Sequence, residues 1–128
     1  MEPMQNYIGG KWCAPTPADF STVVNPATAE VLTKVSTGGG ADIATAVEAA
    51  SAAYPDWRRT PPEERIQFLF KLKQLLEDHF DEIARTTTIE NGKTLAESKG
   101  ELRRGIENVE VACGIPTMMQ GRNLEDVA

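Results

Sequence analysis

The spacing of apolar residues changes partway along the chain. Up to residue 37, apolar residues form short runs separated by glycine, proline and asparagine, which is typical of strands joined by turns. From residue 38 to 116 they recur every three or four positions, which is the spacing of one face of a helix. The sequence therefore predicts a strand and hairpin region at 1–37 and a helical region at 38–116.

Two hairpins are expected in the strand region. Gly9 and Gly10 separate two short β-favouring runs, which indicates a tight two-residue turn. Asn25-Pro26 marks a second turn between a short apolar run and residues 30–36, which alternate like a half-buried strand. Strands this short contribute little core of their own, so they need other elements to pack against.

Four amphipathic helices are expected after the strand region. The first follows three consecutive glycines and should stop near Pro55. The second should begin with Thr60 as its N-cap, because Glu63 stands three residues later and completes a capping box. Pro61 would then occupy the first helical position, where its missing N–H has no consequence.

The boundaries of the third and fourth helices are also indicated by nearby residues. The third should end at Asn91-Gly92, because glycine readily adopts the left-handed conformation of a helix terminus. The fourth should open with the capping box TLAE at 94–97 and end at Gly114 and Pro116. Residues 117–128 are then expected to start the following strand or loop segment.

The second helix is more apolar than one buried face requires. Within nine positions it carries six large apolar residues: Phe68, Leu69, Phe70, Leu72, Leu75 and Leu76. A helix that is apolar most of the way round is normally covered on several sides. We therefore expect an α/β fold class, with short β-hairpins followed by four amphipathic helices, in which the sheet that covers these helices is missing from this segment.

The charge balance disfavours several kinds of partner. Thirteen basic and nineteen acidic residues give a net charge of −6. This charge argues against non-specific binding to nucleic acid or to anionic lipid. No run of about 18 apolar residues occurs, so no membrane-spanning segment is expected.

Cysteine usage indicates a reduced, intracellular compartment, which we take to be the cytoplasm. Cys13 and Cys113 lie far apart and form no C-x-x-C motif. The first seven residues lack the features of a secretory signal or of a transit peptide. The alternative is a secreted protein with a single disulfide bond.

Two glycine-containing segments stand where nucleotide-binding loops would be found. Residues 38–40 lie between a predicted strand and a predicted helix, but a G-x-G-x-x-G fingerprint would need glycine at Ile43. The Gly-Lys-Thr at 92–94 resembles the end of a P-loop, but Thr87 stands where its first glycine is required. Plain turns explain both segments.

Neither the cysteines nor the single histidine has the surroundings that catalysis or metal binding needs. Cys113 continues an apolar stripe near a helix C-terminus, where the helix dipole disfavours a thiolate, so a buried structural cysteine is expected there and also at Cys13. His79 is flanked by Asp78 and Asp81 without the spacing of a metal site, so an exposed histidine is expected. The residues themselves therefore predict no catalytic, metal-binding or cofactor-binding group.

Two neighbouring arginines in the fourth helix have two interpretations. Arg103 and Arg104 lie at helical spacing from Glu101, Glu107 and Glu110, so surface ion pairs along the helix explain them. In the alternative, a guanidinium group binds the carboxylate of a substrate through two parallel hydrogen bonds.

Two glycines interrupt the same helix. Gly100 and Gly105 each destabilise it by about 1 kcal/mol relative to alanine. Close packing of another element would explain them, and a gap for a ligand is the alternative.

Five motifs resemble segments of aldehyde dehydrogenases and occur in the same order and at similar spacing. They are YIGGKW at 7–12, NPATAEV at 25–31, AYPDWR at 53–58, ENGKT at 90–94, and a last group comprising GE at 100–101, RGIENVE at 104–110 and ACGIP at 112–116. The last group specifically resembles the methylmalonate-semialdehyde dehydrogenase branch of that superfamily. Ala29 departs from the usual glycine, and if the turn needs a positive φ, alanine is strained there by about 1 kcal/mol.

The resemblance implies that residues 1–128 are an N-terminal segment of the NAD-binding domain of a longer enzyme, with the central parallel sheet missing. The complete enzyme would be a homo-oligomer that uses NAD and coenzyme A as cosubstrates. It would convert the small aldehydes methylmalonate and malonate semialdehyde to propionyl-CoA and acetyl-CoA. Its catalytic cysteine, oxyanion site and nicotinamide site would lie outside this chain.

The chain alone is therefore expected to be inactive and to bind no cofactor. Within it, the resemblance assigns one functional residue, since Arg104 matches an arginine associated with the substrate carboxylate. Two alternatives remain open. One is a non-enzymatic helical module that binds a partner through residues 66–76, and the other is part of an aldehyde dehydrogenase that uses water instead of coenzyme A.

Overall fold

The computed structural model describes residues 4–16 and 20–122. Contacts divide the chain into two compact units. The first unit comprises residues 1–59 and 86–93, and the second comprises 60–85 and 94–128. Across the described residues, every helix is too short or too polar to cross a membrane.

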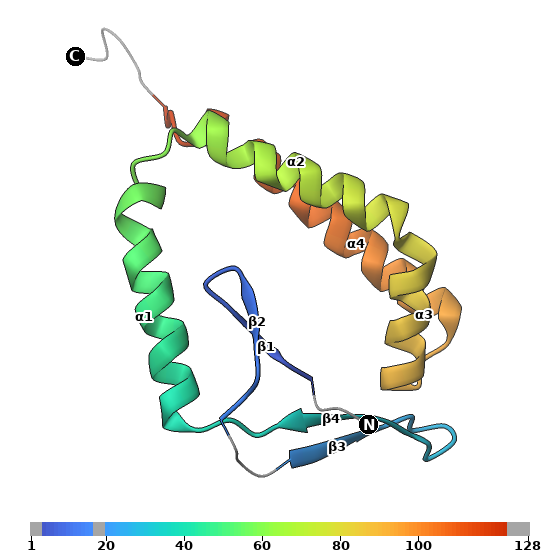
Figure 1. The fold of residues 1–128 in the computed structure, drawn as a ribbon. Coiled ribbons are helices and arrows are strands. Elements are labelled where there is room, and N and C mark those ends of the chain that lie inside the picture. Colours follow the sequence, from blue (N-terminus) through green and yellow to red (C-terminus); the bar gives the residue numbers. More distant parts are fainter. Residues whose placement is uncertain (1–3, 17–19, 123–128) are drawn as a thin grey trace, which may run out of the picture. The chain divides into compact units, whose positions relative to one another are not determined.

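The first unit contains two antiparallel strand pairs, β1 (Asn6–Ile8) with β2 (Lys11–Cys13) and β3 (Phe20–Val24) with β4 (Val31–Ser36) (Figure 1). Gly9 and Gly10 join β1 to β2 with φ angles of 59° and 79°. Positive φ at both central residues is the geometry of a type I′ turn, which matches the twist of the strands. Both predicted hairpins are therefore confirmed.

The turn between β3 and β4 is held by Asn25. Its backbone carbonyl accepts a hydrogen bond from the N–H of Ala29 at 2.8 Å, and its side-chain oxygen accepts one from the N–H of Ala27 at 2.9 Å. Ala29 has a φ of 60°, and it is the one non-glycine residue with positive φ in the described part of the chain. The positive φ on which the expected strain depends is therefore confirmed, and the cost of about 1 kcal/mol for alanine stays a prediction.

Helix α1 (Gly40–Trp57) follows the two strand pairs and also lies wholly in the first unit. It ends at Trp57, two residues beyond Pro55, so the prediction that it stops near this proline is confirmed. Proline lacks only its own N–H, and the helix continues because the N–H of Arg58 still donates to the carbonyl of Tyr54 at 2.9 Å.

The second unit is helical. It contains α2 (Pro62–Asp78), the beginning of α3 (Phe80–Asn91), α4 (Leu95–Cys113) and α5 (Ile115–Met118). Helices α2 and α4 run side by side in opposite directions (Figure 1). Helix α3 starts in this unit and ends in the first one.

The predicted start of α2 was wrong. Its N-cap is Pro61, with φ −53° and ψ 142°, and no side chain caps the helix. A residue that precedes proline is driven away from the helical conformation, so Pro62 forces Pro61 to remain extended. The helix therefore begins at Pro62, one residue later than predicted, and its N-cap is Pro61 instead of Thr60.

The other helix boundaries follow the predicted signals. Gly92 ends α3 with a φ of 81°. Thr94 caps α4, accepting a hydrogen bond from the N–H of Glu97 at 3.3 Å, while the Glu97 carboxylate accepts one from the N–H of Thr94 at 2.9 Å. Helix α5 extends the helical region to Met118, two residues beyond its predicted end, and residues 123–128 lie outside the described part.

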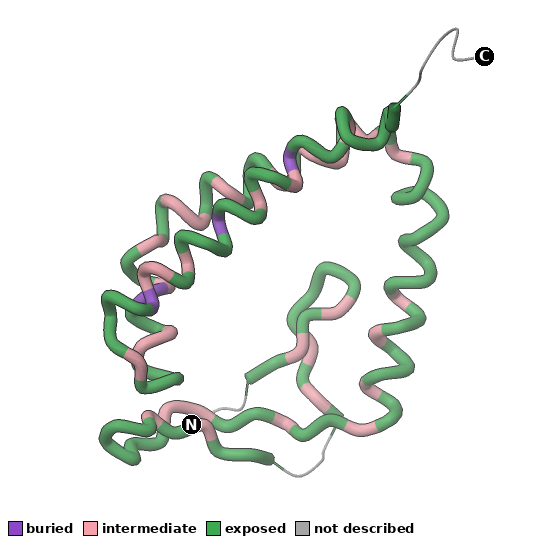
Figure 2. Tube along the Cα trace, turned by 180° about the vertical axis from the view of Figure 1, so that it is seen from behind, coloured by how far each residue is buried: buried purple, intermediate pink, exposed green. Residues whose placement is uncertain are grey.

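The core of the second unit lies between α4 and its neighbours. The buried residues among those described are Ala84, Ser98, Ile106 and Cys113 (Figure 2). Ile106 and Cys113 belong to the apolar stripe predicted for α4, whereas Leu95 is 36% exposed and Ser98 takes the inward position instead. The predicted stripe is therefore confirmed except in its first turn.

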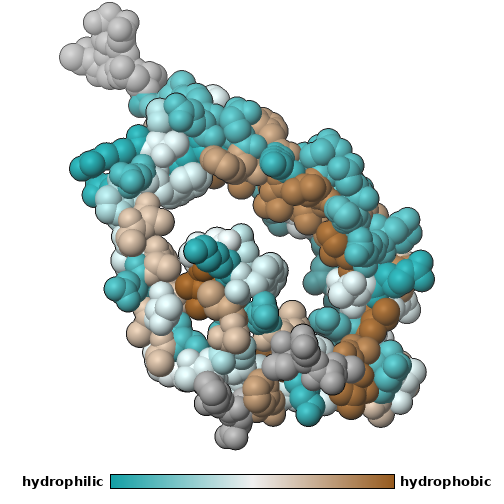
Figure 3. All heavy atoms as spheres, viewed as in Figure 1, coloured by the Kyte–Doolittle hydropathy of each residue, from teal (hydrophilic) through white to brown (hydrophobic). Residues whose placement is uncertain are grey.

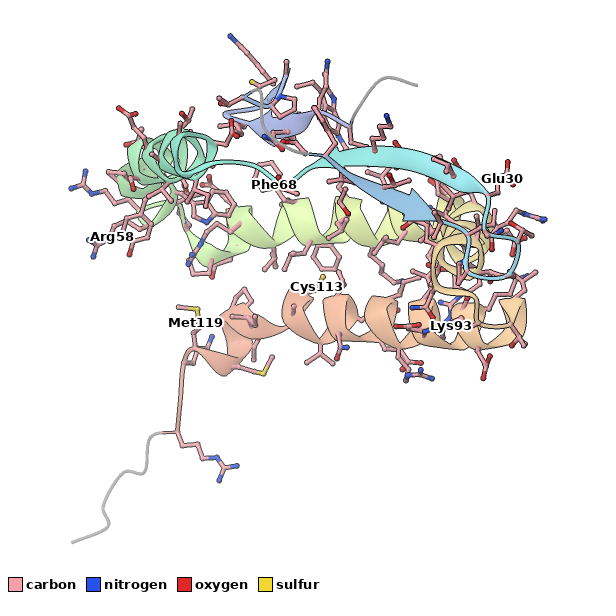
Figure 4. All side chains as sticks on the ribbon, turned by 90° about the horizontal axis from the view of Figure 1, so that it is seen from below. Glu30, Arg58, Phe68, Lys93, Cys113 and Met119 are labelled. Atoms are coloured by element: carbon pink, nitrogen blue, oxygen red, sulfur yellow. The ribbon has the colours of Figure 1, made fainter. Side chains whose placement is uncertain are left out.

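Helix α2 has a second apolar side that is largely exposed in the described part of the chain. Ile66, Leu69 and Leu76 are half-buried. Phe68 is 63% exposed and lies on the side of α2 away from α4 (Figure 4), and Leu72 is 42% exposed. Apolar side chains gather along this helix in the space-filling view (Figure 3). The expectation that α2 carries more than one apolar face is confirmed.

Candidate functional site

Ion pairs connect α4 with α2 and the start of α3 in the described part of the chain. They are Lys73–Glu110 at 3.1 Å, Glu77–Arg103 at 2.6 Å and Asp81–Lys99 at 2.7 Å. The partners on α2 and α3 stand four residues apart, at 73, 77 and 81. Their partners on α4 occur in the reverse order, at 110, 103 and 99, as expected for antiparallel helices. Exposed ion pairs add little stability individually, so their main effect is to fix the register of the two helices.

Arg103 makes the strongest of these contacts. Its Nη1 and Nη2 atoms donate hydrogen bonds to the two carboxylate oxygens of Glu77 at 2.6 and 3.1 Å. The Cζ atom of Arg103 also lies 4.8 Å from the ring centroid of Phe80, which is a cation–π contact. The guanidinium group is thus held on two sides by residues of α2 and α3.

This pairing corrects the sequence-based interpretation of Arg103. We expected surface pairs along α4 itself, where Glu107 is four residues away, but the hydrogen-bonded partner of Arg103 is Glu77 on α2. The hydrogen bond between them lowers the pKa of Glu77 and raises the pKa of Arg103 from their ordinary values. Each group therefore stabilises the charged form of the other.

Arg104 has a different environment. It is exposed, and no residue of 4–16 or 20–122 forms an ion pair with it, so the surface pairs expected with Glu101 and Glu107 are not formed. Its Nη1 atom lies 3.7 Å from the position that a Cβ atom would take on Gly100, one helical turn earlier. The side chain therefore folds back along α4 toward the helix N-terminus, as long helical side chains usually do.

The two glycines of α4 lie in open surroundings. A Cβ atom on Gly105 would meet nothing within 4 Å, and one on Gly100 would meet only Arg104 of the same helix, in the described part of the chain. The expected close approach of another element is therefore absent from these residues. The alternative, a gap for a ligand, stays a prediction.

The N-terminus of α1 is occupied by a carboxylate. Asp42 accepts hydrogen bonds from the N–H of Gly39 at 3.1 Å, the N–H of Thr16 at 3.0 Å and the hydroxyl of Thr16 at 2.7 Å. The hydroxyl contributes most to lowering the pKa of Asp42, followed by the two backbone groups. Since this carboxylate places a negative charge at the helix N-terminus and already takes the N–H of Gly39, the plain-turn interpretation of residues 38–40 is supported.

Cys113 and His79 lie as expected, whereas Cys13 is less buried than predicted. Cys113 is buried, at 9% exposure, on the side of α4 that faces α2 (Figure 4), and Cys13 is a half-buried free thiol. His79 is exposed, with its Nδ1 atom 2.9 Å from Oε2 of Glu82. In the described ranges, no three histidine, cysteine or acidic residues converge in a way that could hold a metal ion.

Two of the recognised motifs meet in the first unit. A Cβ atom placed on Gly92, in the ENGKT segment, would lie 2.7 Å from Cγ of Pro26, in the NPATAEV turn. This distance is far below normal contact, so the end of α3 and the β3–β4 turn pack as closely as a glycine allows. Sequence reasoning missed this contact, because nothing local in either segment indicates the other.

Residues 12–128 match the aldehyde dehydrogenase family. The chain is 47% identical over 125 residues to malonate-semialdehyde dehydrogenase 3 of Geobacillus kaustophilus, which covers 98% of this chain and 26% of that protein. It also superposes on the crystal structure of methylmalonate-semialdehyde dehydrogenase from Oceanimonas doudoroffii with a TM-score of 0.90 and 38% identity. That match covers 100% of this chain and 26% of the solved one.

A second solved structure gives the same result. It is a protein of Sinorhizobium meliloti 1021, described as a methylmalonate-semialdehyde dehydrogenase and complexed with NAD, with a TM-score of 0.89 and 38% identity over 100% of this chain and 26% of that one. The chain thus spans about a quarter of the length of the relatives it matches. The aldehyde dehydrogenase-like fold expected from the motifs is confirmed, and the chain belongs to the aldehyde dehydrogenase family.

Proposed function

We propose that this chain is an N-terminal segment of the NAD-binding domain of a CoA-acylating dehydrogenase. The enzyme oxidises malonate or methylmalonate semialdehyde with NAD and transfers the acyl group to coenzyme A, with loss of CO₂, to give acetyl-CoA or propionyl-CoA. The observation that carries the proposal is the structural match of the whole chain to a solved methylmalonate-semialdehyde dehydrogenase, at a TM-score of 0.90.

We expect no activated nucleophile for this reaction among the described residues. A reactive thiolate needs a nearby cation, a helix N-terminus or a base. Cys113 has the opposite surroundings, because it is buried at the C-terminal end of α4, where the helix dipole opposes negative charge. We therefore expect the isolated chain to be inactive and to bind neither NAD nor coenzyme A, since the reacting groups come from the rest of the enzyme.

Arg104 is the residue of this chain that we assign to the substrate. Both semialdehydes carry a carboxylate, and a guanidinium group matches a carboxylate in charge and in hydrogen-bonding geometry. Arg104 is exposed and has no ion-pair partner among the described residues, so its guanidinium is available. A second cation and the remaining walls of the pocket would come from elsewhere in the enzyme.

The uncovered side of α2 supports the view that this segment belongs to a larger structure. Phe68 and Leu75 are 63% and 47% exposed, and such apolar faces are normally covered by another layer. The central parallel sheet of the NAD-binding domain is the layer that we assign to this role. The complete enzyme would be a cytoplasmic homo-oligomer without a nucleic-acid or membrane partner.

A chimeric enzyme tests the proposal. This chain replaces the matching quarter of the 47% identical relative, and NADH formation from malonate semialdehyde is measured with and without coenzyme A. We expect CoA-dependent turnover by the chimera and none by the chain alone. A soluble, folded chimera without turnover would refute the proposal, and turnover that is independent of coenzyme A would favour a dehydrogenase that uses water instead.

A further inference from the structure

The two neighbouring arginines of α4 differ in how their hydrogen-bonding capacity is used. Arg103 directs two nitrogen atoms to the two oxygens of Glu77 and lies against the ring of Phe80. Arg104 has no ion-pair partner within the described ranges. The Glu77 carboxylate thus binds the guanidinium group of Arg103 and leaves that of Arg104 without an ion pair among the described residues.

This separation matters for the binding of a small carboxylate. Consecutive residues of a helix are rotated by about 100° and displaced by about 1.5 Å along its axis. A substrate whose carboxylate paired with Arg103 would therefore hold its aldehyde in a different place from one that paired with Arg104. A misplacement of about 1 Å can reduce a reaction rate by about 100-fold, so only one of these two modes can be productive.

We propose that Glu77 is a positioning residue for the substrate carboxylate. By occupying Arg103, it removes the competing guanidinium and leaves Arg104 as the free one. The two hydrogen bonds between Arg103 and Glu77, together with the contact to Phe80, also fix the rotation of α4 about its axis. They thereby fix the direction in which the Arg104 side chain leaves the helix. This inference rests on the proposed function, because it assumes that Arg104 binds the substrate.

A neighbouring ion pair allows an effect on helix register to be separated from an effect on the two arginines. Lys73–Glu110 joins the same two helices at 3.1 Å and has similar exposure. Its cation is a lysine, which cannot form two parallel hydrogen bonds to a carboxylate, and neither residue of the pair has an arginine next to it in the sequence. It therefore provides a matched control for a purely structural effect.

The test uses the chimeric enzyme described above, with malonate semialdehyde and the uncharged aldehyde propanal as substrates. In Glu77→Gln, the freed Arg103 binds the carboxylate in a non-productive mode, so we expect kcat for malonate semialdehyde to fall about tenfold. The kinetic constants for propanal should stay within about twofold, because propanal has no carboxylate to misplace. Glu110→Gln should leave both substrates unchanged, and Arg103→Lys, which keeps a cation beside Glu77, should have less effect than Glu77→Gln.

Arg104→Ala is measured in parallel. A selective loss of malonate semialdehyde in both Arg104→Ala and Glu77→Gln supports the inference. A selective loss in Arg104→Ala alone, or an equal loss of both substrates in Glu77→Gln, overturns it while the proposed function stands. If Arg104→Ala shows no selective loss, the assignment of Arg104 fails, and the role of Glu77 fails with it.

Discussion

Gly92 packs so closely against Pro26 that an added Cβ atom would lie 2.7 Å from the proline Cγ. The contact joins the end of α3 to the turn between β3 and β4, two segments far apart in the sequence. Gly92 also has a φ of 81°, which side chains of L-residues rarely adopt. Two independent constraints therefore require glycine at this position.

Gly92→Ala should destabilise the chain by about 2 kcal/mol or more. The left-handed conformation costs about 1 kcal/mol for alanine, and the overlap with Pro26 adds about 1–3 kcal/mol. Urea unfolding followed by circular dichroism measures the change. Gly105→Ala is the control: its Cβ atom would meet nothing within 4 Å, so it should stabilise α4 by about 0.5–1 kcal/mol. Equal midpoints for Gly92→Ala and the unchanged chain would contradict the prediction.

Ala29→Gly should stabilise the β3–β4 turn. Ala29 has a φ of 60°, and glycine adopts this conformation without the steric cost of about 1 kcal/mol that alanine has. The free energy of unfolding should therefore rise by up to about 1 kcal/mol, less the greater flexibility of glycine in the unfolded chain. Ala27→Gly, in the same turn at negative φ, should instead be neutral or destabilising. A lower stability for Ala29→Gly would show that the turn does not hold this residue in the left-handed region.

Boundary signals that act within a few residues were predicted well from the sequence. Gly9, Gly10 and Gly92 adopt positive φ, and Thr94 caps α4, because each signal depends on nearby backbone alone. The start of α2 was missed although its cause is also local. Pro61 and Pro62 are both suited to the first helical position. Pro62 occupies it, because a proline keeps the residue before it out of the helical conformation.

Contacts between elements could not be predicted in the same way. Arg103 was placed correctly on α4, but choosing Glu77 over the acidic residues of its own helix requires the register of α4 against α2. That register comes from tertiary packing, which periodicity within one helix does not specify. Arg104 was identified by resemblance, and the structure adds that its guanidinium remains unpaired in the described part of the chain.

The stability of the first unit should fall in acid because of Asp42. Its hydrogen bonds to Thr16 and Gly39 lower its pKa below the ordinary value of 3.8. An acid whose pKa is lower in the folded state stabilises the fold above the unfolded pKa and loses this effect as pH falls through the folded pKa. The unfolding midpoint of the chain should therefore drop below about pH 4.

Two variants isolate the contribution of Asp42 to this pH dependence. Asp42→Asn should lower stability at pH 7 and flatten the dependence below pH 4, because the titrating group is gone. Thr16→Val removes only the hydroxyl, which is the main cause of the shift, so it should leave a weaker dependence. An unchanged acid profile in Asp42→Asn would assign the loss of stability to other carboxylates.

Arg104→Ala, in the complete enzyme, should discriminate between carboxylated and uncharged substrates. Two hydrogen bonds to a charged group contribute about 1.5–3 kcal/mol each, so kcat/KM for malonate semialdehyde should fall by about 100-fold or more. The value for propanal should stay within about threefold, because no interaction with it is removed. Equal losses for both substrates would return Arg104 to the role of a surface charge.

The isolated chain should behave as a structure with one layer uncovered. The exposed stripe of Phe68, Leu72 and Leu75 on α2 offers a continuous apolar surface, to which hydrophobic dyes bind. Within the described ranges, full burial is limited to four residues, so thermal unfolding should be weakly cooperative. Phe68→Glu should reduce dye fluorescence, whereas Gln67→Glu, which adds the same charge at a neighbouring exposed polar position, should not. A sharp thermal transition in a monomer that binds no dye would show that this segment is complete by itself, and the assignment of a missing sheet would then be wrong.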